Sequence, residues 1–255
     1  MERERIVVSP CSTPEMDLEP VLKAYAVIGY RHFEVFTAWA KSAFDYTRDP
    51  AMYLALGERF RIQFHSLHLP PVNDDLETSL AQAVEAAAFA RAIGVKIVLF
   101  KTTSRPNYIR AAKRFLDAVE TLGLVPVLQN HKGTAISTLQ DFREVLDGIN
   151  DVRMKALLEV GHFHSVGVHW RDGWRLLNGR IALVHIKDQV GAQSVPFGKG
   201  EIDLPGLFRH LDSAGYVGKY VVEMEVADRK NTLSYLAEAL RYLESCGGSG
   251  KEAIP

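Results

Sequence analysis

The sequence has very little cysteine. Only two of its 255 residues are cysteines, Cys11 and Cys246, and they lie near opposite ends of the chain. Two cysteines are too few for a disulfide framework, and their separation is not that of a metal site. A reducing compartment fits this usage best, so we expect a cytoplasmic protein.

The chain also lacks an excess of charge of either sign. Its 30 lysines and arginines nearly balance 31 aspartates and glutamates, which leaves a net charge of -1. Binding to nucleic acid or to anionic lipid normally requires a clearly basic face. We therefore expect a small-molecule partner and no nucleic acid.

Long apolar runs are missing as well. The first five residues carry charges of both signs and lead directly into Ile6–Val8, without the apolar stretch of a signal peptide. The longest apolar stretches are far shorter than the roughly 20 residues that a membrane helix needs. We expect no membrane partner, and 47% hydrophobic with 24% charged residues is the composition of a globular domain.

What the sequence does contain is a recurring junction, in which a helical segment ends at a glycine and a short apolar run follows. The glycines are Gly29, Gly94, Gly123 and Gly215. Glycine is favoured just after a helix because that position is often left-handed. Short runs rich in Val, Ile and Leu are typical of strands buried on both faces of a parallel sheet.

The intervals between these glycines are 65, 29 and 92 residues, close to two, one and three times a period of about 31 residues, the size of one βα unit. Filling the gaps predicts eight strands: 6–8, 32–36, 62–66, 96–100, 125–129, 154–159, 181–186 and 220–224. The helices expected between and after them are 17–28, 50–59, 74–93, 106–122, 138–147, 172–178, 205–214 and 232–244.

Eight βα units in one chain favour a single closed (β/α)8 barrel over an open doubly wound sheet, which usually has five or six strands and a glycine-rich phosphate turn. We expect one barrel domain over residues 1–245. Residues 246–255 show no periodicity and are expected to form a flexible C-terminal tail.

In such a barrel the active site lies at the carboxyl ends of the strands. The residues that close the predicted strands are rich in titratable and polar side chains: Glu34, His65, His68, Lys101, Gln129, Asn130, His131, Glu159, His162, His164, His185, Lys187, Asp188, Glu223 and Glu225. Six of the nine histidines are among them.

Five segments in this order resemble the xylose isomerase-like TIM-barrel family, which includes sugar isomerases and epimerases. The segments are 128–131 (LQNH), 158–162 (LEVGH), 184–188 (VHIKD), 198–203 (GKGEID) and 215–223 (GYVGKYVVE). The last three match the forms H-x-K-D, G-x-G-x-x-D and G-Y-x-G followed by a strand-end glutamate. The resemblance covers nearly the whole chain and supports the barrel.

The resemblance implies a divalent metal held by residues of the last four strands, which here are Gln129, Glu159, His185 and Glu223. Oxygen ligands with one imidazole suit Mn²⁺, Mg²⁺, Co²⁺ or Zn²⁺. The chain departs from the family twice, because Gln129 replaces a glutamate and Glu159 replaces an aspartate. Glutamine can ligate through its carbonyl oxygen, but it carries no charge and cannot act as a base.

We therefore expect an isomerase or epimerase of a small keto sugar or related polyol carbonyl compound, acting through an enediolate stabilised by the metal. Glu223 is the expected base, with His162 stabilising the oxyanion and Lys187 as a further donor. A glutamine at 129 favours one base over two. The expected substrate-binding residues are Glu34, Trp39, His68 and His131.

Other readings remain open. A dehydratase or lyase of the same family, or a sugar-binding barrel that has lost catalysis, would share most of these residues. The family's DNA-repair endonucleases need more histidine and acidic ligands than this chain offers. Barrels of this type often associate, so a homo-oligomer is compatible with the sequence.

Two structural alternatives accompany these assignments. Lys187 and Asp188 could form an ion pair that orients His185. The aromatic segment 37–48 could close over a ligand, or it could simply be anchored to the rim by its aromatic side chains.

Overall fold

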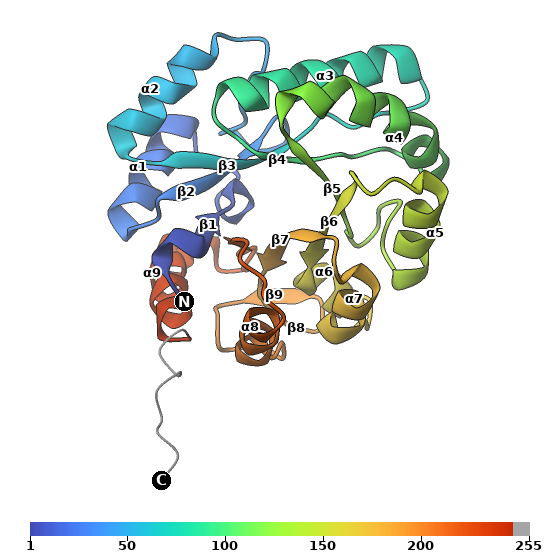
Figure 1. Ribbon diagram of the computed structural model, residues 1–255. Helices are drawn as coiled ribbons and strands as arrows, with labels where there is room; N and C mark the ends of the chain where they lie inside the picture. Colours follow the sequence, from blue (N-terminus) through green and yellow to red (C-terminus); the bar gives the residue numbers. More distant parts are fainter. Residues whose placement is uncertain (247–255) are drawn as a thin grey trace.

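The protein forms a closed barrel of eight parallel strands surrounded by helices, as the computed structural model shows for residues 1–246 (Figure 1). The barrel strands are β1 (Ile6–Val8), β2 (His32–Phe36), β3 (Gln63–His68), β4 (Ile97–Leu99), β5 (Val125–Gln129), β6 (Lys155–Glu159), β7 (Ile181–Ile186) and β10 (Tyr220–Val222). Their order around the ring is β1-β10-β7-β6-β5-β4-β3-β2, and pairing of β1 with β2 closes it. The predicted (β/α)8 fold is confirmed.

Helices follow the barrel strands and cover the outside of the ring. They are α1 (Leu18–Ile28), α2 (Pro50–Phe60), α3 (Leu76–Ala92), α4 (Arg105–Val119), α5 (Leu139–Ile149), α6 (Val160–His164), α7 (Trp170–Leu177), α8 (Leu204–Ser213) and α9 (Thr232–Ser245). Gly29 ends α1 with a φ of 117°, a left-handed conformation that strains other residues. Thr138 starts α5 with a capping box in which Asp141 takes part.

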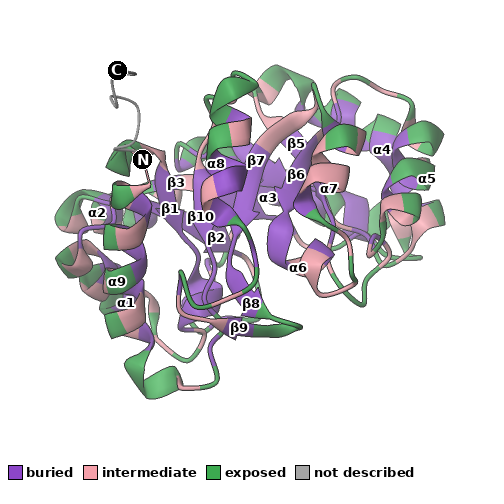
Figure 2. Ribbon diagram, turned by 90° about the horizontal axis from the view of Figure 1, so that it is seen from below, coloured by how far each residue is buried: buried purple, intermediate pink, exposed green. Residues whose placement is uncertain are grey.

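The barrel strands alternate between two apolar layers. Seven side chains form the inner layer: Val7, Ile97, Leu99, Val127, Leu157, Leu183 and Val221. Their neighbours along the strands, such as Ile6 and Val8, belong to the larger core between the barrel and the helices. Figure 2 shows the barrel strands mostly buried, whereas the helices are buried on one side and exposed on the other.

The structure adds elements that the sequence did not predict. Helix α6 lies between β6 and α7, and an antiparallel hairpin, β8 (Asp188–Val190) with β9 (Gln193–Val195), follows β7. Strand β3 extends to His68, two residues beyond the predicted end, and β10 stops at Val222. The expected tail at 246–255 lies, apart from Cys246, outside the described residues.

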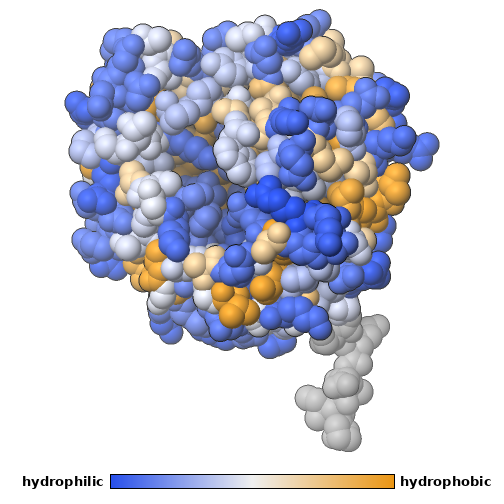
Figure 3. Space-filling model, turned by 180° about the vertical axis from the view of Figure 1, so that it is seen from behind, coloured by the Kyte–Doolittle hydropathy of each residue, from blue (hydrophilic) through white to orange (hydrophobic). Residues whose placement is uncertain are grey.

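The outer surface of the barrel is mainly polar. Figure 3 shows one face that is largely hydrophilic, with hydrophobic residues in a few small groups. Among the described residues, no helix has the length and apolar character required to cross a lipid bilayer.

Candidate active site

The side chains of the site continue the inner face of the barrel strands. Two positions beyond the inner apolar layer on β4, β5, β6, β7 and β10 stand Lys101, Gln129, Glu159, His185 and Glu223. Because residues i and i+2 of a strand share a face, these five side chains point inward at the carboxyl end of the barrel. The alternation of side chains along the strands therefore brings these five residues together.

His185 lies at the centre of three buried carboxylates. Its Nδ1 is 3.0 Å from Glu223 Oε1 and 3.1 Å from Glu159 Oε2, and its Nε2 is 3.1 Å from Glu34 Oε1. Glu34, Glu159 and His185 are fully buried. Nδ1 thus faces two carboxylates, and Nε2 faces the third.

The charges in this cluster depend on one another. Burial opposes a charge on His185, but Glu34 and Glu223 outweigh it and hold the pKa of this imidazole well above its usual range. Burial also opposes ionisation of Glu223, yet Lys187 and His185 hold its pKa well below the usual range. Burial, followed by the nearby Glu223 charge, raises the pKa of Glu159. Within the carboxylate pair at His185 Nδ1, the surroundings thus favour ionisation of Glu223 more than that of Glu159.

Glu34 has a different position from the one expected. It was expected to bind substrate, but its side chain is fully buried behind the cavity wall. Its Oε1 accepts a hydrogen bond from Ser66 Oγ at 2.9 Å and lies 3.2 Å from His68 Nε2. Burial opposes its ionisation, but His185 and His68 hold its pKa well below the usual range. Its contacts make Glu34 a partner of the two histidines.

Lys187 forms ion pairs with glutamates of the neighbouring strand end. Its ammonium lies 2.7 Å from Glu223 Oε2 and 2.9 Å from Glu225 Oε2, and the residue is 1% exposed. Burial would lower the pKa of Lys187, but Glu223 and Glu159 raise it well above its usual range. The stem of Lys187 passes so close to Gly161 that a Cβ there would lie 3.0 Å from Cε and nearer still to Cγ and Cδ.

Asp188 does not pair with Lys187. Its carboxylate instead accepts backbone N–H bonds from Gly198 at 2.9 Å, Gly200 at 2.8 Å and Ile202 at 3.4 Å. The aspartate of the H-x-K-D segment therefore holds the glycine-rich segment that follows β9. The suggested ion pair between Lys187 and Asp188 is not formed. Lys187 pairs with two glutamates, and Asp188 accepts hydrogen bonds from backbone N–H groups.

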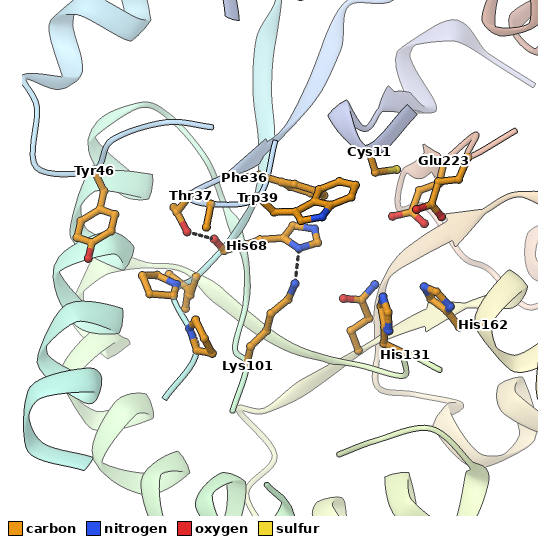
Figure 4. A pocket seen from close by; sticks show the side chains of 16 residues that line it. Cys11, Phe36, Thr37, Trp39, Tyr46, His68, Lys101, His131, His162 and Glu223 are labelled. Carbon is orange, nitrogen blue, oxygen red and sulfur yellow. Dashed lines mark hydrogen bonds between the residues drawn. The ribbon is translucent and has the colours of Figure 1, made fainter. Parts of the chain in front are cut away.

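A cavity of about 510 Å³ opens above the cluster (Figure 4). Its lining comes from the loops and strand ends at the carboxyl side of the barrel: Cys11, Phe36, Thr37, Ala38, Trp39, Tyr46, His68, Leu69, Pro70, Pro71, Lys101, Gln129, His131, His162, Glu223 and Glu225. Of the cluster, Glu223 reaches the cavity, whereas Glu159 and His185 lie beneath it.

His131 and His162 pack against each other at one side of the cavity, with their ring planes inclined at 38°. Their ring centroids are 3.8 Å apart, and Figure 4 shows both rings next to Glu223. Burial, together with the charge of Lys187, lowers the pKa of His162 to about 2. His162 is therefore a neutral imidazole at physiological pH, with one N–H to donate.

Lys101 and His68 occupy the other side. Lys101 Nζ lies 2.6 Å from His68 Nδ1, as the dashed line in Figure 4 shows. Burial and the neighbouring Lys101 lower the pKa of His68 to about 4. Burial lowers the pKa of Lys101 to about 8, while Glu34 and Glu223 oppose this change. At pH 7 the lysine is charged and the histidine is neutral.

The aromatic segment after β2 is anchored to the barrel at one residue and lines the cavity at another. Phe44 is buried and stacks on Tyr53 at 4.2 Å, which anchors the segment to the barrel. Trp39 is 66% exposed, lines the cavity and has a φ of 75°. Positive φ at a bulky residue stores strain, which is found most often at functional sites.

The structure brings together most of the sequence-predicted residues. Trp39, His68, His131, His162, Gln129 and Glu223 line the cavity, and Glu159, His185 and Lys187 lie directly beneath. His65 instead lies beside His32, at the opposite end of the barrel strands, and His164 lies 3.2 Å from Glu201. The sequence did not single out Lys101 for a role, although its alternation with Leu99 marks it as inward-facing.

The donor set fits a divalent cation. One oxygen each of Glu159 and Glu223 and a nitrogen of His185 lie within 4.8 Å of one another, and Glu159 Oε2 is buried without a hydrogen-bond partner among the described residues. Two carboxylates and one imidazole suit a hard or borderline cation. Glu34, His68 and His185 form a second such group, but Ser66 already donates to the oxygen of Glu34 that both rings approach.

A family model described as "xylose isomerase-like TIM barrel" matches residues 22–246. The chain belongs to this family, as its (β/α)8 barrel and ordered strand-end motifs indicate. The resemblance seen in the sequence is thereby confirmed.

Individual relatives share part of the sequence. An inosose dehydratase of Geobacillus thermodenitrificans is 29% identical over 164 residues, which are 54% of each chain. A putative L-ribulose-5-phosphate 3-epimerase of Escherichia coli is 35% identical over 95 residues, covering 34% of this chain and 33% of the relative. The chain thus spans about half or less of the length of these relatives. A solved protein with a bound zinc atom has a TM-score of 0.75 at 16% identity, covering 98% of this chain and all of that one.

Proposed function

We propose that the protein is a divalent-metal-dependent enzyme that removes a proton from the carbon next to a carbonyl group of a small polyhydroxylated ketone. The observation that carries this proposal is the buried Glu159–His185–Glu223 group beneath a cavity of about 510 Å³. The inosose dehydratase and ribulose-phosphate epimerase among the relatives both act on such compounds by name.

Glu159, His185 and Glu223 would hold the cation, with the carbonyl oxygen of Gln129 as a further ligand. When bound, the cation would supply a Lewis acid for neighbouring carbonyl and hydroxyl oxygens. The zinc in a structural neighbour supports a metal of this kind. Mn²⁺, Mg²⁺, Co²⁺ and Zn²⁺ all suit the donor set.

Glu223 is the proposed base. It is held ionised by Lys187 and His185, and it reaches the cavity where the substrate carbon would lie. Lys187 fixes one oxygen of this carboxylate at 2.7 Å and leaves the other near His185. The neutral His162 would donate its N–H to the oxygen that gains negative charge as the proton leaves.

Return of the proton by the same carboxylate to the neighbouring carbon, which was the carbonyl carbon, gives an isomerase. Gln129 stands where the family usually has a second glutamate, and an amide cannot deliver a proton from the opposite face. The site therefore favours a shuttle by one base over inversion by two.

A dehydratase is the second candidate, and Gln129 favours it too. After the same first step, loss of a hydroxyl group from the adjacent carbon needs no base on the opposite face. The proton that Glu223 has removed from carbon can then pass from this carboxyl group to the departing hydroxyl, which leaves as water.

The test uses scyllo-inosose and L-ribulose 5-phosphate with Mn²⁺ in D₂O. We expect the wild type to exchange a carbon-bound proton of one of them, and Glu223→Gln to lose this exchange by at least about a hundredfold. Glu238→Gln, on the exposed face of α9, is the matched control and should exchange normally. Exchange by Glu223→Gln at the wild-type rate would disprove the assignment of the base. Mass analysis separates the two candidates, because only dehydration lowers the product mass.

A further inference from the structure

We propose that Lys101 binds a carboxylate of the substrate, so that the protein acts on an acidic sugar or polyhydroxy keto acid. This inference rests on the proposed function and narrows its substrate class. It comes from the charge distribution around the cavity, in which Lys101 is the one lysine among the lining residues.

The cavity has two electrostatically different sides. On one side lie Glu223 and Glu225, with Lys187 paired to both. Lys101 follows β4, which is four strands away from β10 in the eight-stranded ring. Lys101 and Glu223 therefore face each other across the barrel mouth, as Figure 4 shows. A substrate that places its carbonyl near Glu223 extends its far end toward Lys101.

Within the described part of the chain, Lys101 has no acidic partner of its own. Among residues 1–246, no carboxylate lies within ion-pair distance of its ammonium, and its close polar contact is the neutral His68 at 2.6 Å. The β4–β5 register pairs Leu99 with Val127, and continuing it by two residues places Lys101 beside Gln129. The neighbour that could have neutralised the lysine is thus an uncharged amide.

The surroundings strengthen an ionic contact at this position. Phe36, Leu69 and Trp39 line the same cavity, and apolar walls reduce screening by water. His68 fixes the ammonium in place from one direction and leaves its other N–H donors for a ligand.

The hydrogen-bond donors and positive charges near Lys101 fit a carboxylate better than a phosphate. Phosphate sites usually combine several cations or backbone N–H groups. The described lining contains no arginine, and Pro70 and Pro71 on this side have no N–H. Arg105, shortly after Lys101, is engaged by Asp141 at 2.6 Å and Glu144 at 3.2 Å. One lysine matches one singly charged group.

Three ketohexoses that differ only at C6 test the inference: D-fructuronate, D-fructose and D-fructose 6-phosphate. Calorimetry would measure their binding to the wild type, Lys101→Gln and Lys101→Arg, with and without Mn²⁺. Lys96→Gln, an exposed change before the other end of the same strand, is the matched control. Proton exchange in D₂O with D-fructose would be followed in parallel.

We expect the wild type and Lys96→Gln to bind the acid at least about tenfold more tightly than the neutral sugar, a difference of about 1.4 kcal/mol. Lys101→Gln should remove this preference, and Lys101→Arg should keep most of it. The preference for the acid over the neutral sugar is measured on the wild type itself, so this part of the test does not depend on whether a variant folds.

Several results would overturn the inference. The role of Lys101 would be refuted if the wild type bound the acid and the neutral sugar equally, or if Lys101→Gln kept the preference for the acid. In either case, proton exchange with D-fructose would leave the proposed function intact. Tighter binding of the phosphate than of the acid would assign the lysine to phosphate. Failure of all three sugars to bind, together with no proton exchange of scyllo-inosose or L-ribulose 5-phosphate, would refute the proposed function as well.

Discussion

Gly161 allows the backbone of α6 to pass against the stem of Lys187, and a single methyl group there tests the arrangement of the site. A Cβ at position 161 would lie 3.0 Å from Lys187 Cε and closer to Cγ and Cδ. Real Cβ atoms do not approach so closely, so the lysine stem must shift. The ammonium of Lys187 is buried and held 2.7 Å from Glu223 and 2.9 Å from Glu225.

We expect Gly161→Ala to lower the free energy of unfolding by about 2 kcal/mol, the usual cost of overpacking a close-packed site. A shift of about 1 Å in Lys187 would also move the Glu223 carboxylate, and misplacement of that size can slow catalysis by about a hundredfold. Urea unfolding measures the first effect, and proton exchange in D₂O measures the second.

A double-mutant cycle with Lys187→Ala isolates the steric cause. Lys187→Ala removes the atoms that clash and leaves the buried Oε2 of Glu223 without its ammonium partner, which should cost about 3–5 kcal/mol by itself. In that background Gly161→Ala should be nearly neutral, giving a coupling energy of about 2 kcal/mol. If the two changes were additive within about 0.5 kcal/mol, the close approach of Gly161 to Lys187 would not be the origin of the effect.

Three further predictions concern other parts of the barrel. Glu34→Gln should weaken Mn²⁺ binding in calorimetry by about 10–100-fold, because it removes the charge that faces His185; unchanged affinity would contradict this role. Burial lowers the pKa of His65 to about 3, so the unfolded chain binds more protons below pH 6.5 and stability falls as pH decreases. His65→Gln should recover about 1 kcal/mol of the loss at pH 5, and parallel pH profiles of urea unfolding would rule this out. Gly200→Ala should disorder the segment held by Asp188, because a Cβ would lie 2.6 Å from the backbone N of residue 189 and closer to the carboxylate; proteolysis between residues 193 and 202 would report it.

The fold could be predicted because local and global signals agree. Strands 32–36, 125–129 and 181–186 were predicted with their observed bounds, since each follows a helix or turn and consists mainly of buried apolar residues. Helix α6 and the β8–β9 hairpin were missed. Their segments of three to five residues are too short for a hydrophobic period to develop.

The site was predictable to the extent that it follows strand alternation. Gln129, Glu159, His185 and Glu223 all come two residues after an inner apolar side chain, so their shared position could be expected. Contacts that depend on packing could not. Nothing in the spacing showed that Lys187 would pair with glutamates 36 and 38 residues away, or that Asp188 would turn toward backbone N–H groups.

The uncharged Gln129 and the unpaired Lys101 belong to one electrostatic arrangement. Residue 129 belongs to the strand next to the one that Lys101 follows, so a glutamate there could approach the ammonium. At a separation of about 5 Å and an effective dielectric constant near 20, their attraction would be about 3 kcal/mol, enough to compete with a ligand for the lysine. With glutamine there, the negative charge that Lys101 can neutralise must arrive with the substrate. The same substitution leaves Glu223 as the ionised carboxylate that reaches the cavity close to His185. Under the proposed function, the uncharged side chain at 129 thus bears on both ends of the cavity: on the proton transfer by Glu223 and on the charge of the substrate that Lys101 would bind.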